Sequence, residues 1–440
     1  MADAREVALL TLAACEKQGA WSDGYLKKML REHQLDSRDA ALATRLCFGV
    51  LQNRMLIDWH LASFCNTALN KLDLKVLCAL RTAVYQILFM DKIPSSAAVN
   101  EAVNLTKKYC RNPRASGMVN GILRSILRAE KLDEPVGKDR LETISIKYSH
   151  PRWLVEEFAA TLGIDDTEKL LSADNAQPPI TVQVNTTKAA TEQVEEILRL
   201  EGVETVRHPL LSDCLLLSGT GNLERLTAFH DGLIYVQDVA ARLAVTAAGI
   251  QPGQRVLDCC AAPGGKSFAT AIDLQNRGEV ISCDIHDHKI KLLEAGRDRL
   301  GLNIIKPLLH SATERNDEWV SGFDTVITDV PCSGLGIIRK KPDIRYKNPE
   351  PLKNLPEVQR SILNNCSAYV KPGGILIYAT CTLLKRENED IVLDFLASHP
   401  EFTAESLGLD VLSGKNSTLT FWPHIHGTDG FFVAKLRKKG

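Results

Sequence analysis

Strands and helices alternate along the second half of the chain, and this pattern limits the fold more than any other feature. From Asp238 onward, apolar runs such as "RVLDCC", "EVISCD" and "GGILIYATC" are separated by helical stretches. Such alternation is typical of a parallel sheet whose strands are joined by right-handed helical crossovers. We therefore expect an α/β domain over residues 241–440. Its tail, "TLTFWPHIHGTDGFFVAKL", predicts two antiparallel strands joined by a turn that contains Asp429-Gly430.

The first 140 residues show a different pattern. Between Glu6 and about Arg128, apolar residues recur at three- and four-residue spacing, as in "VLCALRTAVYQILFM", with no convincing strand between them. We predict an all-helical domain over residues 1–140. Within it, residues 104–128 contain six Lys/Arg and no acid. Such a stretch is typical either of a solvated helix face or of a patch that binds RNA.

Two shorter regions connect these halves. The segment "YSHPRWLVEEF" predicts a connector helix within 141–165, with Pro151 in its first turn. Residues 166–240 then contain an alternating strand, "PPITVQVNTT", an amphipathic helix that ends at Gly202, and another strand, "CLLLSG". We expect a small α/β subdomain there.

Length and composition exclude several classes of protein. A chain of 440 residues exceeds what one core normally supports, so we expect two or three domains. The N-terminus lacks the pattern of a signal peptide, and no window of about 18 apolar residues predicts a transmembrane helix, which favours a cytoplasmic protein without a membrane partner. The 12 cysteines show no ligand spacing, so we expect mostly free thiols and no metal. A net charge of -1 gives no overall sign of a nucleic-acid partner.

A loop suited to ligand binding follows the first strand of the predicted sheet. In "VLDCCAAPGGKS", a buried strand runs into small residues and then a helix, and Gly264 and Gly265 let backbone N–H groups approach a ligand closely. The loop is neither G-x-G-x-x-G nor a Walker A loop, so it favours neither a dinucleotide nor ATP. Asp284 ends the next strand, where a doubly wound fold places an acid that binds ribose hydroxyls; a helix N-cap is the alternative.

Three motifs, "DCCAAPGGK", "DVPCSGLG" and "YATCT", resemble in this order those of RNA (cytosine-5) methyltransferases that use S-adenosylmethionine. The helical front resembles the NusB RNA-binding fold, and "DSRDAALATRLCFGVLQNR" and "IPSSAAVNEAV" resemble blocks of the RsmB/Sun/Fmu family of bacterial 16S rRNA methyltransferases. The resemblance covers essentially the whole chain. It implies a Rossmann-like methyltransferase sheet behind a NusB-like domain, in a monomer that methylates 16S rRNA.

The motifs leave other functions open. A methyltransferase of tRNA or another RNA would carry the same catalytic motifs. A non-catalytic RNA-binding assembly factor is an alternative from a different class.

The resemblance assigns catalytic roles to four residues. Carbon 5 of cytosine is a poor nucleophile, so a thiolate must first add to carbon 6; Cys381 would be that thiolate. Cys332 would help to release the product, a structural thiol being the alternative. Asp329 would hydrogen-bond a flipped cytosine and is also a candidate to contact the cofactor. Lys266 would lower the pKa of a thiol, bind the base or line the cofactor loop.

The same resemblance implies an S-adenosylmethionine site in the loops after the first strands. Its expected residues are Cys260, Ala261, Ala262, Pro263, Gly264, Gly265, Lys266, Asp284, Ser311 and Asp329. At Ser311 many relatives carry an acid near the adenine, so a hydroxyl replaces a carboxylate, although it can still accept a hydrogen bond from an amine.

A basic segment, "IIRKKPDIRYK", follows the second cysteine motif. Its cations, Arg339, Lys340, Lys341 and Arg345, are candidates to bind phosphates, and Tyr346 is a candidate to stack on a base. A mobile, solvated loop is the alternative.

Overall fold

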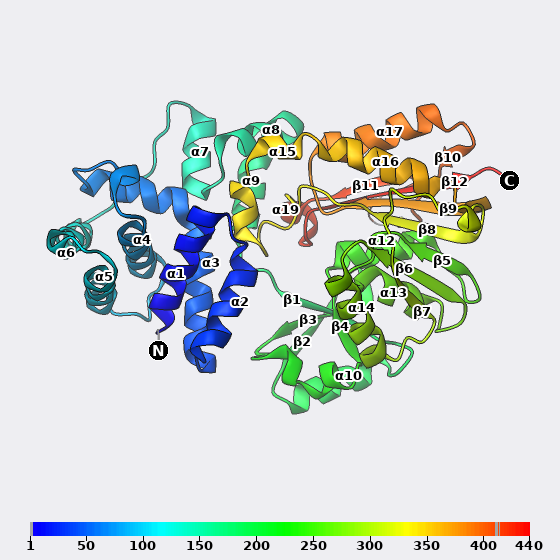
Figure 1. The fold of residues 1–440 in the computed structure, drawn as a ribbon, viewed down its shortest axis with the longest axis horizontal. Coiled ribbons are helices and arrows are strands. Elements are labelled where there is room, and N and C mark those ends of the chain that lie inside the picture. Colours follow the sequence, from blue (N-terminus) through cyan, green and yellow to red (C-terminus); the bar gives the residue numbers. More distant parts are fainter. Residues whose placement is uncertain (1–2, 410–411, 413) are drawn as a thin grey trace. The chain divides into compact units, whose positions relative to one another are not determined.

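The protein folds into two compact units in the computed structural model, which describes residues 3–409, 412 and 414–440 (Figure 1). The helical unit comprises Met1–Ala176 together with Ile338–Lys347. The sheet unit comprises Gln177–Ile337 and Asn348–Gly440. A ten-residue segment that lies between two parts of the sheet unit in sequence therefore belongs to the helical unit.

Helices alone build the described part of the helical unit, as predicted for residues 1–140. Asp3, Asp36 and Asp73 begin three of the longer helices, because each side chain accepts a hydrogen bond from the backbone of the first turn. Buried apolar side chains of the first six helices form one core. The elements of this unit are α1 (Ala4–Gln18), α2 (Ser22–His33), α3 (Ser37–Phe64), η1 (Leu69–Lys71), α4 (Leu74–Phe89), α5 (Ser95–Tyr109), α6 (Pro113–Arg128), α7 (Arg140–Tyr148), α8 (Arg152–Leu162), α9 (Ile164–Asp174) and η4 (Pro342–Tyr346).

The connector predicted as one helix over 141–165 is instead split among α7, α8 and α9. Ser149 adopts a left-handed backbone at φ 57° and ends α7, and Pro151 precedes α8. Gly163 separates α8 from α9 with a φ of 77°. The helix α9 also occupies the first part of the predicted subdomain over 166–240, so the first strand begins only at Ile180.

The smaller sheet of the sheet unit has four antiparallel strands in the order β2-β3-β1-β4. This arrangement confirms the small α/β subdomain, because both predicted strands and the amphipathic helix are present. Its elements are β1 (Ile180–Val184), α10 (Thr191–Leu200), β2 (Glu204–His208), β3 (Leu211–Ser218), η2 (Leu223–Arg225), α11 (Thr227–His230) and β4 (Ile234–Val236).

The larger sheet has eight strands in the order β10-β12-β9-β8-β5-β6-β7, with β11 paired to β12. The five strands from β9 to β7 are parallel, as the alternating sequence predicts, and β10, β11 and β12 add an antiparallel edge. Its elements are α12 (Val239–Ala248), β5 (Arg255–Asp258), α13 (Gly265–Asp273), β6 (Glu279–Asp284), α14 (Asp287–Leu300), β7 (Ile305–Leu309), η3 (Asp317–Trp319), β8 (Phe323–Asp329), α15 (Pro349–Leu352), α16 (Leu355–Ser367), β9 (Val370–Thr380), η5 (Lys385–Glu387), α17 (Glu389–Ser398), β10 (Phe402–Ala404), β11 (Thr418–Phe421), α19 (Pro423–His426) and β12 (Phe431–Lys438).

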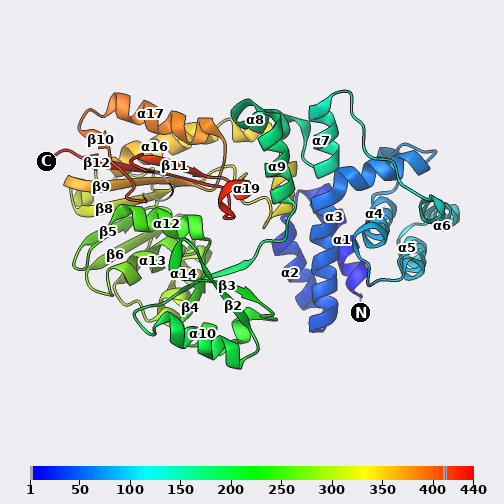
Figure 2. The same ribbon diagram turned by 180° about the vertical axis from the view of Figure 1, so that it is seen from behind.

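Helices cover both faces of this sheet, and successive strand residues pack into different layers (Figure 2). Ile377 lies in the core formed with α12, α13 and α14, whereas its neighbour Tyr378 lies in the core formed with α16 and α17. This follows from the two-residue period of a strand. A sheet covered on both faces leaves only the strand ends available for ligands.

The C-terminal tail departs from its prediction in one respect. The two strands β11 and β12 pair antiparallel as expected. The short helix α19, which begins at Pro423, lies between them, so they are not joined by a simple turn. Asp429-Gly430 instead lead directly into β12.

Arg345, predicted to bind phosphate, is fully buried inside the helical unit. The prediction is wrong because the guanidinium is enclosed by oxygen acceptors of α3, α7 and α9 and of the residues next to them. Nη1 donates to the carbonyls of Gln52, Tyr148 and Ser149 and to Oδ1 of Asn175, at 3.1, 3.3, 3.4 and 2.8 Å, and Nη2 donates to the carbonyl of Asp174 at 3.5 Å.

Tyr346 is held in the same way, so the prediction that it stacks on a base is also wrong. Its hydroxyl donates to the carbonyl of Leu51 at 2.8 Å, and the guanidinium of Arg54 lies 3.6 Å from the centre of its ring. A ring already covered by a cation on α3 is not free to stack on a nucleotide.

Candidate active site

Two cysteines lie side by side at the ends of adjacent strands. Cys381 directly follows β9, and Cys332 follows β8 after a short turn. The two strands are parallel and in register, with Asp329 opposite Ala379, so their carboxyl ends meet at one place. The sulfurs are 3.2 Å apart, as expected for neighbouring strand ends, and both are free thiols.

An ion pair between a buried lysine and a partly exposed aspartate accompanies the thiols. Lys266 begins the first turn of α13, and its Nζ donates to Oδ2 of Asp329, at the end of β8, at 2.6 Å. Burial alone would lower the pKa of Lys266, but the charge of Asp329 and its hydrogen bond outweigh burial and raise this pKa. Nζ also lies 4.9 Å from the ring centre of Phe431, which the sequence reading missed. The only sequence signal for it was an aromatic pair after Gly430, at the start of the last strand.

Charges around the two sulfurs act on them unequally. The hydrogen bond between the two thiols lowers the pKa of Cys381, with help from the Lys266 charge, whereas burial, Asp329 and Asp429 oppose this. The same hydrogen bond raises the pKa of Cys332, and burial adds to it. These directions favour Cys381 as the sulfur that loses its proton first.

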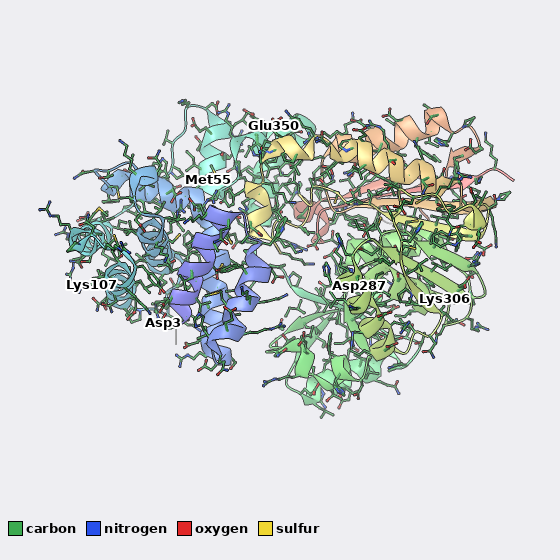
Figure 3. All side chains as sticks on the ribbon, in the orientation of Figure 1. Asp3, Met55, Lys107, Asp287, Lys306 and Glu350 are labelled. Atoms are coloured by element: carbon green, nitrogen blue, oxygen red, sulfur yellow. The ribbon has the colours of Figure 1, made fainter. Side chains whose placement is uncertain are left out.

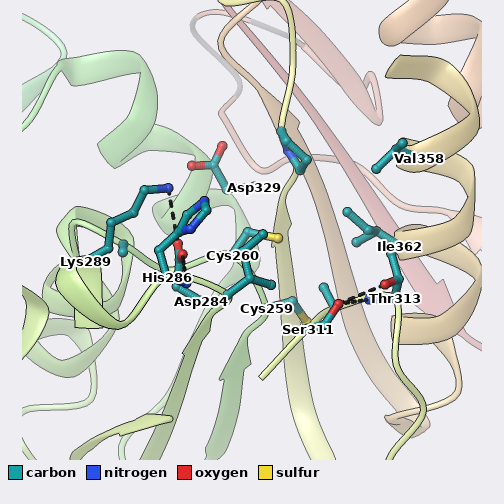
Figure 4. Close-up of a pocket in the computed structure, with 14 residues that line it drawn as sticks. Cys259, Cys260, Asp284, His286, Lys289, Ser311, Thr313, Asp329, Val358 and Ile362 are labelled. Atoms are coloured by element: carbon teal, nitrogen blue, oxygen red, sulfur yellow. Dashed lines mark hydrogen bonds and ion pairs between the residues drawn. The ribbon is translucent and has the colours of Figure 1, made fainter. Parts of the chain in front are cut away.

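A cavity of about 340 Å³ opens beside this group, and its lining residues come from the ends of the parallel strands and from α16 (Figure 4). Its volume falls in the range of small-molecule sites, about 300–1,000 Å³. Residues expected to bind the cofactor that line it are Cys260, Ala262, Asp284, Ser311 and Asp329. Lining residues that the sequence reading missed are Cys259, Ile285, His286, Lys289, Ala312, Thr313, Pro331, Val358 and Ile362.

The other expected cofactor residues, Ala261, Pro263, Gly264, Gly265 and Lys266, form the rest of the loop and the first turn of α13. Gly264 has a φ of 115° and donates its N–H to the carbonyl of Ala261 at 2.8 Å. A Cβ on Gly264 would lie 2.4 Å from the ring of Phe268, so only glycine fits there. The loop turns tightly enough to place the N-terminus of α13 beside the cavity.

Asp284 and Ser311 lie on the wall of the cavity that β6 and β7 provide (Figure 4). Oδ1 of Asp284 accepts the N–H of His286 at 3.0 Å, and Lys289 lies 3.7 Å from Oδ2. Asp284 is not the N-cap of α14, because His286 holds that position. Ser311 is partly exposed, and its hydroxyl is 2.8 Å from that of Thr313.

The opposite wall of the cavity is apolar. Val358 and Ile362 project from α16, and Figure 4 shows them across the cavity from Asp284. No local motif marks these residues, because α16 reads as an ordinary amphipathic helix. They become part of the site only through the packing of α16 on the sheet.

No group of three or more His, Cys, Asp or Glu side chains is arranged to hold a metal ion within the described residues. None of the helices in the described part of the chain has the length and apolar character that a membrane span requires.

Comparison with known proteins identifies the family. Three family models match along the chain: the NusB family over residues 2–128, a ferredoxin-like domain of RsmF/B-type methyltransferases over 150–224, and 16S rRNA methyltransferase RsmB/F over 245–437. A probable ribosomal RNA small subunit methyltransferase B of Bacillus subtilis is 36% identical over 99% of both chains. The chain belongs to the RsmB family of 16S rRNA methyltransferases.

Other relatives agree with this membership. Ribosomal RNA small subunit methyltransferase B of Klebsiella pneumoniae is 29% identical and covers 93% of this chain. Among solved structures, PH0851 is 29% identical, covers 100% of this chain and has a TM-score of 0.82. NSun6 from Pyrococcus horikoshii, solved with SFG, shares the fold at 22% identity and a TM-score of 0.60 over 66% of the chain. The protein is thus an enzyme of an S-adenosylmethionine-dependent methyltransferase family, as the motifs predict.

Proposed function

We propose that this RsmB-family enzyme methylates carbon 5 of a cytosine in 16S rRNA through a covalent bond between Cys381 and carbon 6 of the base. The observation that carries this proposal is the pair of thiols 3.2 Å apart beside the Lys266–Asp329 ion pair. Cytosine needs a nucleophile at carbon 6 and an acid or base at carbon 5 during the same reaction. One sulfur of the pair can attack carbon 6, while the other lies close enough to assist the later proton transfer at carbon 5.

The chain's own residues have separate tasks in this reaction. The Cys381 thiolate adds to carbon 6, and Asp329, oriented by Lys266, binds the polar edge of the base. S-Adenosylmethionine supplies, when bound, the methyl group that carbon 5 accepts. Cys332, after it has released its own proton to solvent, then accepts the proton of carbon 5; the electron pair of that C–H bond restores the ring double bond, and the bond from carbon 6 to Cys381 breaks to return the thiolate.

The cavity fits S-adenosylmethionine by the chemistry of its walls. The carboxylate of Asp284 can accept hydrogen bonds from both ribose hydroxyls. Ile285, Val358 and Ile362 provide apolar surface for an adenine ring, with the Ser311 hydroxyl as a polar partner. Asp329 and Pro331 line the same cavity, and Pro331 directly precedes Cys332 in sequence, so a methyl donor bound there would lie beside the thiols.

The helical unit offers a surface for RNA. The six cations of residues 104–128 are exposed on α5, on α6 and between these helices; they are Lys107, Lys108, Arg111, Arg114, Arg124 and Arg128. Figure 3 shows Lys107 at the outer side of this helix pair. We propose that this basic surface binds rRNA phosphates, with an affinity that weakens as salt increases.

Separate replacement of the two cysteines tests the mechanism. We expect Cys381→Ala to abolish methylation and to form no covalent RNA adduct. Cys332→Ala should stall after methyl transfer and accumulate a protein–RNA species that survives denaturing electrophoresis. The double variant should lose that species, because no sulfur remains to attack carbon 6.

Cys65→Ala is the matched control, since Cys65 is also a partly exposed free thiol but lies in the helical unit, outside the basic surface of residues 104–128. It should methylate RNA at the wild-type rate. Adducts that persist in Cys381→Ala and vanish in Cys332→Ala would reverse the two roles.

Replacement of Asp284 tests the cofactor site. Asp284→Asn should raise the dissociation constant for S-adenosylmethionine about tenfold or more, which corresponds to about 1.4 kcal/mol of binding free energy. Isothermal titration calorimetry measures this change. Asp287→Asn, at an exposed carboxylate paired with Lys291, is the control and should leave the constant unchanged. An unchanged constant in Asp284→Asn would remove Asp284 from the ribose.

A further inference from the structure

A buried glutamate that neither the motifs nor the mechanism above assigns holds the backbone around Cys332. Glu387 ends the short helix η5, and its side chain is inaccessible to solvent. Its Oε2 accepts the N–H of Ser333, the residue after Cys332, at 2.9 Å. Burying a carboxylate costs free energy unless it is hydrogen-bonded, so the burial of Glu387 against this loop requires a physical explanation.

Gln359 completes the contact on the other side of Cys332. Its Nε2 donates to the same Oε2 of Glu387 at 2.9 Å and to the carbonyl of Pro331 at 3.0 Å. The residues before and after Cys332 are therefore both tied to the Glu387–Gln359 pair. Gln359 is also fully buried, on α16, so the loop is fixed against a helix of the core.

The loop is also tied to the other thiol. The hydroxyls of Ser333 and Thr382 are 2.6 Å apart, and Thr382 directly follows Cys381. Gly336 donates its N–H to the carbonyl of Cys381 at 2.9 Å, and a Cβ on Gly336 would lie 2.0 Å from the carbonyl oxygen of Gly430. Fixing the Cys332 loop thus also fixes the distance between the two sulfurs.

Shape alone does not require a carboxylate at position 387. Both hydrogen bonds reach one oxygen, and an amide oxygen in the same place would accept them equally well. What glutamate adds is negative charge near Cys332, and that charge contributes to the raised pKa of this thiol, after the effects of Cys381 and burial. Lys266 acts in the opposite direction on Cys381, whose pKa it helps to lower.

The other titratable groups around the sulfurs do not favour a proton on Cys332 over a proton on Cys381. Asp329 raises the pKa of both thiols, and Asp429 raises that of Cys381. Tyr378, whose hydroxyl donates to the Glu387 carbonyl at 2.6 Å, has a raised pKa because it is buried, and Cys332 and Glu387 add to that effect, so it stays neutral. Among these groups, Glu387 and Lys266 are the two charges that favour a proton on Cys332 and a charge on Cys381.

We propose that Glu387 is a positioning residue that fixes the Cys332 loop and keeps the proton shared by the two thiols on Cys332. This inference rests on the proposed function, because it leaves Cys381 as the thiolate that attacks carbon 6. Gln359 is its partner, since it links the carboxylate to the residue before Cys332.

The test uses the full-length protein without RNA. Each thiol is alkylated with iodoacetamide over a pH series, and modification at Cys332 and Cys381 is counted separately by peptide mass spectrometry. In the wild type Cys381 should react at lower pH than Cys332, because the thiolate is the reactive form. Glu387→Gln keeps the hydrogen bonds and removes the charge. It should move the Cys332 profile to lower pH by about one unit, so that Cys332 reacts about tenfold faster at a fixed pH below its midpoint.

Glu389→Gln is the matched control, because it makes the same chemical change two residues away, where Glu389 contacts the Thr420 hydroxyl at 3.1 Å. Its profiles should match the wild type. An unchanged Cys332 profile in a folded Glu387→Gln protein would overturn the proposal.

Gln359→Met provides an independent variant. It keeps the carboxylate of Glu387 but removes the hydrogen bond from residue 359 to the carbonyl of Pro331. It should lower kcat for RNA methylation while the KM for S-adenosylmethionine stays constant. An unaltered kcat in that variant would equally overturn the proposal.

Failure of the proposed function has a different outcome. If wild-type protein does not methylate cytosine in RNA, the alkylation profiles still report whether Glu387 separates the two thiols. If methylation is normal and the profiles of Glu387→Gln and the wild type coincide, the function stands and the role of Glu387 is refuted.

Discussion

Two basic segments look alike in the sequence and differ completely in the structure. Residues 104–128 expose their cations on α5, on α6 and between these helices, whereas Arg345 in Ile338–Lys347 lies at the centre of a cage of oxygen atoms in the helical unit. Both segments follow the rule that clustered cations favour nucleic acid. All six cations of the first segment are exposed, whereas in the second segment Lys341 is exposed but Arg345 is fully buried. Clustered cations in a sequence therefore indicate a candidate surface for nucleic acid. Whether a given cation is available to bind it depends on the hydrogen-bond acceptors that surround that cation in the fold.

The difference between the segments lies in what their neighbours offer. The α5–α6 cations face outward from an amphipathic pair whose apolar residues, such as Val119 and Leu123, fill the core. Arg345 instead meets the C-terminal ends of α7 and α9, where carbonyl groups lack helical partners, and the carbonyl of Gln52 beside the kink of α3 at Asn53. A guanidinium has five N–H donors in a planar fork, so it can satisfy several such carbonyls together.

The largest expected effect comes from removing the buried cation. Arg345→Met should lower the free energy of unfolding of the helical unit by about 3 kcal/mol or more, because several buried acceptors lose their donor at once. Urea denaturation and limited proteolysis of the full chain measure the loss. Lys341→Met is the control, since Lys341 lies in the same segment and is exposed. If Arg345→Met is as stable as the wild type but binds RNA poorly, the segment is an RNA contact after all.

The same contrast shows how far the sequence alone could lead. Alternating strands and helices predicted the parallel sheet, because these elements follow from local periodicity and chain direction. The family resemblance, and not the periodicity, assigned Cys332 and Cys381 to one site. Val358, Phe431 and Glu387 were not predicted. Each reaches the site through packing between elements far apart in the chain, which no local pattern encodes. The burial of Arg345 was missed for the same reason.

The second prediction concerns the exposed segment. Charge reversal by Lys107→Glu, Arg111→Glu and Arg114→Glu should weaken RNA binding about tenfold or more and reduce the slope of affinity against salt, because fewer phosphate contacts release counterions. Stability should change by less than about 0.5 kcal/mol, as is usual for surface positions. Filter binding at several salt concentrations measures the affinity, and cofactor titration should give the wild-type constant.

Charge reversal elsewhere in the helical unit is the control for this prediction. Lys17, Lys27 and Lys28 are exposed on α1 and α2, and their reversal changes the net charge by the same amount. If both triple variants lose RNA affinity equally, the effect is one of total charge. The basic surface of α5 and α6 would then have no special role.

The smallest expected effect separates two neighbouring lysines within the exposed segment. Lys107 is simply exposed, whereas Nζ of Lys108 lies 2.7 Å from the largely buried carboxylate of Glu6, which also accepts a hydrogen bond from Tyr109. Burial alone would raise the pKa of Glu6, but the hydrogen bonds from Lys108 and Tyr109 outweigh it and lower this pKa. A carboxyl with a lowered pKa in the folded state stabilises the fold above its unfolded pKa, and that contribution is lost as the pH falls through the folded-state value.

Lys108→Ala should therefore reduce the free energy of unfolding by about 1 kcal/mol at neutral pH, since the ion pair is half exposed on the lysine side. The difference from the wild type should shrink as the pH falls through the folded-state pKa of Glu6, because a protonated carboxyl no longer favours the lysine. Lys107→Ala should lower RNA affinity without this change in stability. Urea denaturation at neutral and acidic pH distinguishes the two variants. A stability difference for Lys108→Ala that persists undiminished in acid would show that the methylene stem of Lys108, and not its charge, holds α5 against α1.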